Sequence, residues 1–196
     1  MSGAVILPLK RAMKFYTYKP PSPLSRYIEV FWYCEDYLLE HRWERIVPTP
    51  QAQLLVNLGE DELRWRTPDG RRHRASGAGF SAESFQAVDI DTRQQVHIMG
   101  ALFSPGGASV LSPHPAEVTL NQHLDLSDFL PDQLFLRERL LEESTVLPRF
   151  LLLQNLLSER LATQGYRGGS GREDRPRRVN LWTRDGHVGV RFRRRL

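Results

Sequence analysis

The sequence has a single cysteine, Cys34, among its 196 residues, and so cannot form an internal disulfide. This is typical of a protein in a reducing compartment. Cys34 lies in the apolar run VFWYC without a second cysteine or a histidine beside it, which favours a small buried residue. No uncharged apolar run approaches the ~18 residues that a membrane-spanning helix needs, and the first residues show no signal-peptide cleavage site. We therefore expect a cytoplasmic protein with no membrane segment.

The sequence also lacks the common motifs of catalysis. Its histidines show no His-x-His or His-x3-His spacing, whereas a protein-bound metal needs several ligands converging at ~2 Å; they are residues 41, 73, 97, 114, 123 and 187. The glycine-rich stretches GAGF and SPGGAS do not open a helix with the Lys-Ser/Thr of a phosphate loop. Ser104 lacks the Gly-x-Ser-x-Gly context of a nucleophile elbow. We therefore predict no metal, no cofactor, no catalytic residue and no enzyme.

Positive charge is concentrated at the end of the chain. Residues 1–164 hold 17 Lys and Arg against 20 Asp and Glu, a net charge of −3, whereas residues 165–196 hold 10 Arg against 3 acids, a net charge of +7. Any binding of nucleic acid driven by overall charge would therefore depend on these 32 residues. They are rich in Gly and Arg and sustain no period of 3.6 or 2, so we predict a disordered tail.

Residues 15–104 have the pattern of β-structure. Pro20, Pro21 and Pro23 rule out a regular helix there, and aromatic and β-branched residues follow. In the hairpin ELRWRTPDGRRHRA, apolar residues alternate with Arg before a Pro-Asp-Gly turn. Short strands at this spacing predict a sandwich or a barrel. The strand segments are at about 28–35, 52–59, 62–75 as the hairpin, 84–90 and 94–104.

After residue 108 the pattern becomes helical. Apolar residues recur at spacings near 3 and 4, and the clearest helix runs from Thr145 to Gly165. Its apolar residues form a stripe wider than one buried face needs; they are Leu147, Phe150, Leu151, Leu153, Leu156, Leu157 and Leu161. Such a stripe is typical of a helix that packs on its own domain and also contacts a partner chain. Docking of the whole stripe on its own domain is the alternative interpretation.

Three blocks carry a resemblance to a known family. They are YKPPSPLSRYIEVFWYCE, RIVPTPQAQLLVNLG and GALFSPGGASVLSPHPAEVTLNQHLDLSDF. In this order they resemble the amino-terminal sensing domain of a group of AraC-type transcriptional regulators, with its Tyr-x-Pro-Pro start, its Phe-Trp motif, its Leu-x-x-Asn-Leu-Gly strand and its Phe-x-Pro-Gly-Gly turn. The resemblance covers residues 15–163.

The resemblance implies a cupin-like β-barrel in a mainly β fold with carboxy-terminal helices. Residues 1–130 would form the sensing domain, in which the turn at Pro105, Gly106 and Gly107 leads into a segment that caps the barrel. Residues 131–164 would form a helical dimerisation segment and residues 165–196 the tail. A homodimer through residues 131–163 and a small-molecule effector are the expected partners. Residues proposed to line the effector pocket are Trp32, Asn57, Trp65, Phe80 and Phe103.

The sequence departs from this family after the dimerisation segment. The pair of helix-turn-helix units by which such a regulator contacts DNA would need regular helical periods, which the remaining residues do not have. We therefore expect a truncated or frameshifted regulator, whose DNA contact depends on the missing units. Two alternatives stay open: a free-standing cupin-type small-molecule-binding protein or enzyme, and a nucleic-acid-binding protein that acts through the Arg-rich tail.

Overall fold

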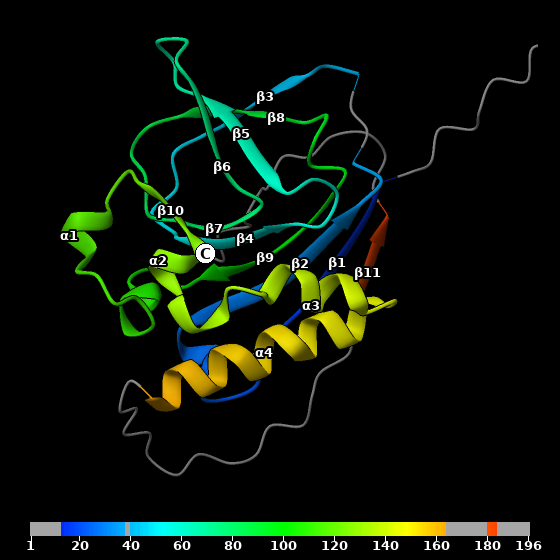
Figure 1. Cartoon of the computed structure of the whole chain (residues 1–196), viewed down its shortest axis with the longest axis vertical. Helices are drawn as coiled ribbons and strands as arrows, with labels where there is room; N and C mark the ends of the chain where they lie inside the picture. Colours follow the sequence, from blue (N-terminus) through cyan, green and yellow to red (C-terminus); the bar gives the residue numbers. More distant parts are fainter. Residues whose placement is uncertain (1–12, 38–39, 164–179, 184–196) are drawn as a thin grey trace, which may run out of the picture.

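The computed structural model describes residues 13–37, 40–163 and 180–183. Its helices and strands form three layers, with a small sheet, a large sheet and a layer of helices stacked in that order (Figure 1). The strands are β1 Lys14–Tyr18, β2 Ile28–Glu35, β3 Trp43–Ile46, β4 Gln53–Asn57, β5 Glu62–Arg66, β6 Arg72–Ser76, β7 Ala78–Ser81, β8 Val88–Asp91, β9 His97–Phe103, β10 His123–Asp125 and β11 Asn180–Thr183. The helices and 3-10 turns are η1 Leu24–Arg26, η2 Gly107–Val110, α1 Ala116–Thr119, α2 Leu126–Phe129, η3 Pro131–Gln133, α3 Leu136–Glu142 and α4 Val146–Thr163.

The strands form two antiparallel sheets. Sheet A has the order β10-β7-β4-β9-β2-β1-β11, and sheet B has the order β3-β8-β5-β6. The expectation of mainly β structure followed by helices is confirmed. The predicted closed barrel is not formed by the described residues, because neither edge of sheet A pairs with an edge of sheet B. The chain passes from β6 to β7 through Gly77 alone, so the two stacked sheets adjoin at this point.

Each predicted strand segment contains a strand, but only the segment at 28–35 has the predicted boundaries; β8 begins four residues later than predicted and β9 three residues later. β2 spans the residues expected from its aromatic and β-branched run. The hairpin of β5 and β6 turns where Gly70 has φ +85° and its amide donates to the Thr67 carbonyl at 2.9 Å. Most of the predicted tail, residues 165–196, lies outside the described residues. Within it, Asn180–Thr183 form β11, which pairs antiparallel with β1.

The turn after β9 redirects the chain over the end of sheet A. Gly106 has φ +71°, a left-handed conformation that glycine adopts without strain. A side chain at Gly107 would collide with the Tyr27 carbonyl, so the next segment packs directly on the start of β2. The segment expected to cap a barrel, residues 108–130, contains η2, α1, β10 and α2. Within it, β10 extends the edge of sheet A by pairing with β7.

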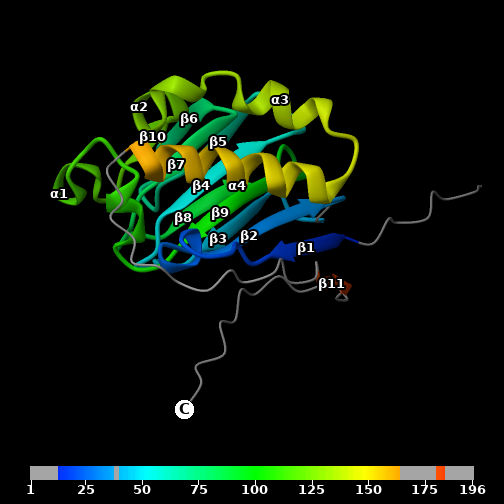
Figure 2. The same ribbon diagram turned by 90° about the horizontal axis from the view of Figure 1, so that it is seen from below.

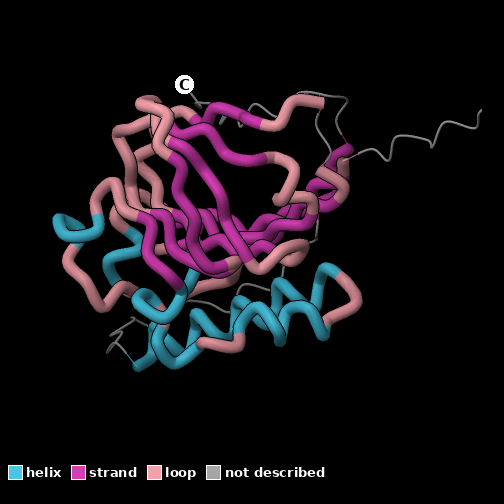
Figure 3. Tube along the Cα trace, turned by 45° about the horizontal axis from the view of Figure 1, so that its top comes forward, coloured by secondary structure: helices cyan, strands magenta, loops and turns pink. Residues whose placement is uncertain are grey.

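The main core lies between sheet A and the helices. Figures 2 and 3 show α4 running along one face of sheet A, with α3 beside it. Tyr18 stacks on Phe150 at 5.7 Å between ring centroids, and its hydroxyl donates to Gln154 at 2.8 Å. We call this side the helix face of sheet A. Five apolar residues of the predicted stripe are buried here: Phe150, Leu153, Leu156, Leu157 and Leu161. Leu147 and Leu151 remain exposed.

Three phenylalanines on this side join β7, β9 and α2. Phe129 stacks on Phe80 at 4.0 Å between centroids with 3° between the planes, and Phe103 meets both rings edge-on. All three are at most 1% exposed. We call them the phenylalanine cluster. It fixes α2, and with it the start of the helical layer, to sheet A.

Replacing Phe129 by alanine is expected to remove about 3–5 kcal/mol from the free energy of unfolding, because a fully buried ring leaves a cavity. Urea denaturation followed by circular dichroism measures the change. The matched control is Phe135→Ala, whose ring is 71% exposed and whose loss should cost about 0.5 kcal/mol or less. Equal losses for the two variants would contradict the assignment of Phe129 to the core.

Candidate functional site

The face of sheet A opposite the helices is turned toward sheet B. Strand register places Thr17, Trp32, Gly100, Leu55 and Gly79 in one row across this inner face. In sheet B the facing row is Glu44, Ile90, Trp65 and His73. A second, smaller core joins the two rows; its buried members are Cys34, Tyr37, Leu63 and Ile98, with Trp32, Leu55 and Trp65 packed against them. The inner faces of the two sheets therefore meet over aromatic side chains.

Three aromatic side chains between the sheets, those of Trp65, His73 and His123, are in contact, and Trp32 packs against the same small core. Trp65 stacks on His73 with centroids 5.3 Å apart and 11° between the planes. His123, on β10, contacts the Trp65 ring at 5.0 Å. We call Trp32, Trp65, His73 and His123 the aromatic site. Both tryptophans are partly exposed, so the site has aromatic surface that solvent reaches.

Two glycines of sheet A make room for two of these rings. A Cβ at Gly100 would lie 3.0 Å from Trp32 Cε2, and one at Gly79 would lie 2.5 Å from His123 Nε2. The indole and the imidazole therefore rest on bare backbone. A side chain at either glycine would also collide with a neighbouring backbone carbonyl, that of Leu54 at Gly100 and that of Leu124 at Gly79, so ring and backbone together explain why these strand positions are glycine.

His123 is the chemically distinctive member of the aromatic site. Its Nε2 is buried and has no hydrogen-bond partner among the described residues. Burial lowers the pKa of His123 to about 4, and the nearby Asp125 carboxylate offsets this only in part. At neutral pH the imidazole is therefore uncharged, with one nitrogen free to donate and the other to accept.

The charges on the inner faces are negative. Tyr37 donates its hydroxyl to Glu44, and burial raises the pKa of the Glu44 carboxyl. The other carboxylate beside the site is Asp125. In strands β1 to β10, no Lys or Arg shares the side of its strand with Trp32 or Trp65.

The arginines of sheet B lie on its outer face instead. Asp89 accepts from Arg45 at 2.7 Å and from Arg66 at 3.0 Å, and the Arg45 guanidinium lowers the pKa of that carboxyl. Arg66 also lies over the Trp43 ring, 4.6 Å from its centroid. Asp91 forms an ion pair with Arg42, with 2.9 Å between the guanidinium nitrogen and the carboxylate oxygen. These side chains bind one another, so we interpret the outer face as structural.

The five residues predicted to line a pocket are divided among three places. Trp32 and Trp65 lie together between the sheets. Phe80 and Phe103 lie on the helix face, in the phenylalanine cluster. Asn57 is fully buried and uses its whole amide on the backbone: it donates to the carbonyls of residues 62 and 94 at 2.9 and 3.0 Å, and it accepts from the amides of residues 59 and 60.

Three residues of the inner faces were not among those predicted. The alternation of apolar and polar residues in the hairpin could have predicted that His73 lies beside Trp65, because both residues fall on its apolar face. Glu44 lies in a strand that the sequence pattern does not mark. His123 comes from a short edge strand inside the segment expected to cap the barrel, and no local pattern reveals its contact with Trp65.

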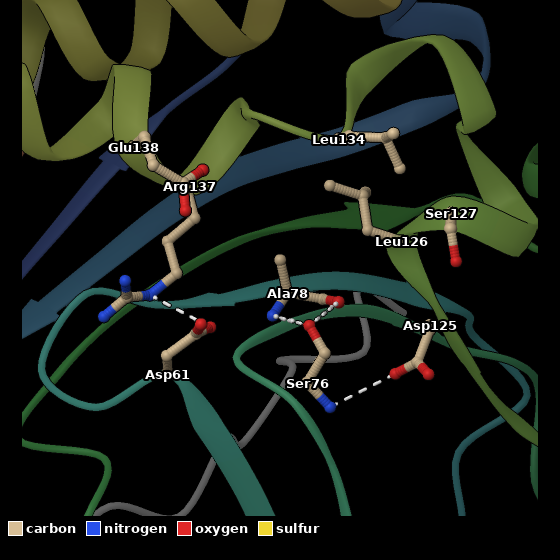
Figure 4. A pocket seen from close by; sticks show the side chains of 9 residues that line it. All are labelled: Asp61, Ser76, Ala78, Asp125, Leu126, Ser127, Leu134, Arg137 and Glu138. Carbon is tan, nitrogen blue, oxygen red and sulfur yellow. Dashed lines mark hydrogen bonds and ion pairs between the residues drawn. The ribbon is translucent and has the colours of Figure 1, made fainter.

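A separate cleft of about 220 Å³ lies where sheet A meets the helices (Figure 4). Arg137 spans its edge, donating to the Asn57 carbonyl at 2.8 Å and lying 3.5 Å from Asp61. Asp125 accepts from the Ser76 amide at 3.1 Å on the other side. The cleft is lined by Asp61, Ser76, Ala78, Asp125, Leu126, Ser127, Leu134, Arg137 and Glu138. It adjoins the aromatic site through β10.

Neither a metal site nor a reactive cysteine is found in the described part of the chain. No three His, Cys, Asp or Glu side chains there are grouped so that they could hold a metal ion. Burial raises the pKa of the Cys34 thiol to about 12, so it stays protonated and unreactive. No helix of the described residues has the length and apolar character needed to cross a membrane.

A family model described as a domain of unknown function (DUF6597) matches residues 16–125, more than half of the chain. The chain belongs to this family. The match includes the strands of both sheets from β2 to β10, and thus all four residues of the aromatic site. Searches among curated proteins and among solved structures found no significant match.

The buried neutral state of His123 predicts a dependence of stability on pH. Because its folded pKa is depressed, its contribution is complete above pH ~6.5 and is lost as the pH falls toward 4. Over this range the native protein should lose on the order of 2 kcal/mol more unfolding free energy than His123→Gln, allowing for the partly exposed ring. Urea denaturation at several pH values measures this, and parallel curves for the two proteins would count against a buried neutral histidine.

Proposed function

We propose that this chain is the effector-sensing and dimerisation part of a cytoplasmic AraC-type transcriptional regulator, with a cupin-like β-domain. The three blocks that carry the resemblance fall on adjoining elements, namely the end of β1 with β2, β4 with its following turn, and β9 with η2 and α2. The family match covers nearly all of the same residues. The effector would bind at the aromatic site.

The observation that carries this proposal is the position of sheet A between the aromatic site and the helices. In β2, Trp32 faces the site while Phe31 and Tyr33 face the helices. In β9, Ile98 and Gly100 alternate in the same way with Met99 and Ala101. A ligand that shifts these strands on one face must shift the packing on the other. Sheet A therefore supplies a direct route from effector to helices.

The helical arm, residues 131–163, offers a surface for the second copy. Leu147 and Leu151 lie one turn apart on α4 with exposures of 45% and 38%. Other exposed apolar side chains of the arm are Leu134, Phe135 and Leu141. Apolar side chains left exposed on a helix whose opposite side is buried are typical of a contact with a partner. A homodimer through this arm is the proposed assembly.

The double variant Leu147→Lys/Leu151→Lys should weaken dimerisation at least tenfold, because two charges would be placed at the apolar contact. Sedimentation velocity over a concentration series measures the dissociation constant. Leu120→Lys is the matched control, since Leu120 is also 38% exposed but lies in the β-domain. A native protein that sediments as a monomer of 22.7 kDa at every concentration would refute the dimer.

Sensing itself predicts a linkage between ligand and dimer. A small molecule that raises the melting temperature of the full chain should also change the dimer dissociation constant severalfold, since an effector acts only through a difference in affinity between two states. Trp65→Ala should abolish both effects. A native-like circular dichroism spectrum of this variant at the assay temperature is the control.

The alternative function is a free-standing cupin-type small-molecule-binding protein or enzyme. The linkage experiment separates the two functions. Binding at the aromatic site that leaves dimerisation unchanged would support the free-standing protein, and stoichiometric metal in the purified protein would support an enzyme.

A further inference from the structure

We propose that the hairpin of β5 and β6 contacts the phosphate backbone of double-stranded DNA through the arginines that it presents on the outer face of sheet B. The inference goes beyond the proposed function, because it requires neither an effector nor a dimer. It assigns to the β-domain a contact with nucleic acid that is separate from the Arg-rich residues 165–196.

Positive charge is concentrated on this hairpin. Residues 62–76 contain five arginines and no lysine against two acids, a net charge of +3, whereas residues 1–164 as a whole carry −3. The field beside the hairpin is therefore opposite in sign to that of the remaining residues of this stretch, and it would orient the domain on a polyanion. The arginines are Arg64, Arg66, Arg71, Arg72 and Arg74.

The register of the hairpin places like charges directly opposite one another. Arg64 faces Arg74 across the two strands, and Arg66 faces Arg72. Opposed like charges destabilise an antiparallel pair, so these arginines lower the stability of the hairpin wherever anions do not lie beside them. A polyanion bound along this face would relieve the repulsion.

The ion pairs that stabilise the outer face weaken toward β6. On β5, Arg66 lies 3.0 Å from Asp89. On β6, Arg72 is exposed and forms no ion pair with any described residue. The Arg74 side chain is 77% exposed, although it lies 3.3 Å from Glu62. Because β6 is the last strand of sheet B, the least neutralised cations line an edge of the molecule.

The position and chemistry of the hairpin fit a phosphate backbone. Its turn projects at the end of the molecule away from α4 (Figure 1). Arg72 and Arg74 are alternate residues of one strand, about 7 Å apart, so they can contact two phosphates of a duplex at once. Guanidinium groups bind phosphate oxygens in bidentate pairs. No large apolar side chain of residues 62–76 is exposed, which disfavours insertion into a membrane surface.

Fluorescence anisotropy of the full chain with a labelled duplex of about 20 base pairs tests the inference, over about 50–200 mM salt. Arg72→Gln/Arg74→Gln should weaken binding at least fivefold at about 100 mM salt. It should also reduce the slope of the logarithm of affinity against the logarithm of salt concentration by about 2, because each phosphate contact contributes ~0.9.

The matched control is Arg93→Gln/Arg139→Gln, which removes the same charge from two exposed arginines outside the hairpin. It should leave the salt slope unchanged and the affinity within about twofold of the native value. Both variants keep residues 165–196, whose net charge is +7. Equal affinities and equal slopes for the two variants would assign the binding to those residues and overturn the inference.

Thermal unfolding without DNA supplies a second readout. The melting temperature of Arg72→Gln/Arg74→Gln should equal or exceed that of the native protein, because two pairs of opposed like charges are removed. A fall of more than about 4 °C would show that the fold itself needs these arginines, and it would overturn the inference.

Vesicles containing phosphatidylserine and poly-glutamate are the competing anions, at the same concentration of charge as the duplex. Binding through Arg72 and Arg74 that is as tight to either of them as to the duplex would overturn the choice of partner. The proposed function is judged separately, by the dimer dissociation constant and its response to an effector. Either idea can therefore fail while the other stands.

Discussion

Burial of sheet A on both faces is the constraint on which the rest of the structure depends. Each of its central strands must supply apolar side chains in two directions, so β2 and β9 read as almost continuous apolar runs. The side chains on one side pack under α4, where Tyr18 stacks on both Phe31 and Phe150. The side chains on the other side pack against sheet B. The helices and the aromatic site are therefore coupled by geometry, because they share the same backbone.

The same constraint explains what the sequence could predict. The sequence segments of β2, β4 and β9 were recognisable as strands because the side chains on both of their faces are mostly apolar. The hairpin of β5 and β6 was recognisable because one face is apolar and the other is charged. The five buried residues of α4 follow the helical period. In each case the local pattern and the tertiary environment agree.

The parts that the sequence could not predict depend on which face a residue takes in a sheet buried on both sides. Phe80 and Trp65 are equally plausible as pocket residues from their types alone, yet the register of β7 against β4 turns Phe80 toward α2. Asn57 suggested a polar group for a ligand, but its amide is needed to hold the turn after β4. His123 is recruited from β10, far along the chain from Trp65. A one-residue difference in register would exchange all these assignments.

Strand β10 contributes to both sides of sheet A and leads directly into the helical layer. His123 lies on the aromatic site, while Leu124 is the register partner of Phe80. Asp125 then holds the Ser76 amide, and Phe129 of α2 stacks on Phe80. Only one residue separates Phe129 from η3, the first turn of the helical arm. Because the phenylalanine cluster is close-packed, β10 cannot move over Trp65 without disturbing it. A molecule that displaces His123 would therefore act on the start of the arm through the shortest stretch of chain that joins the two.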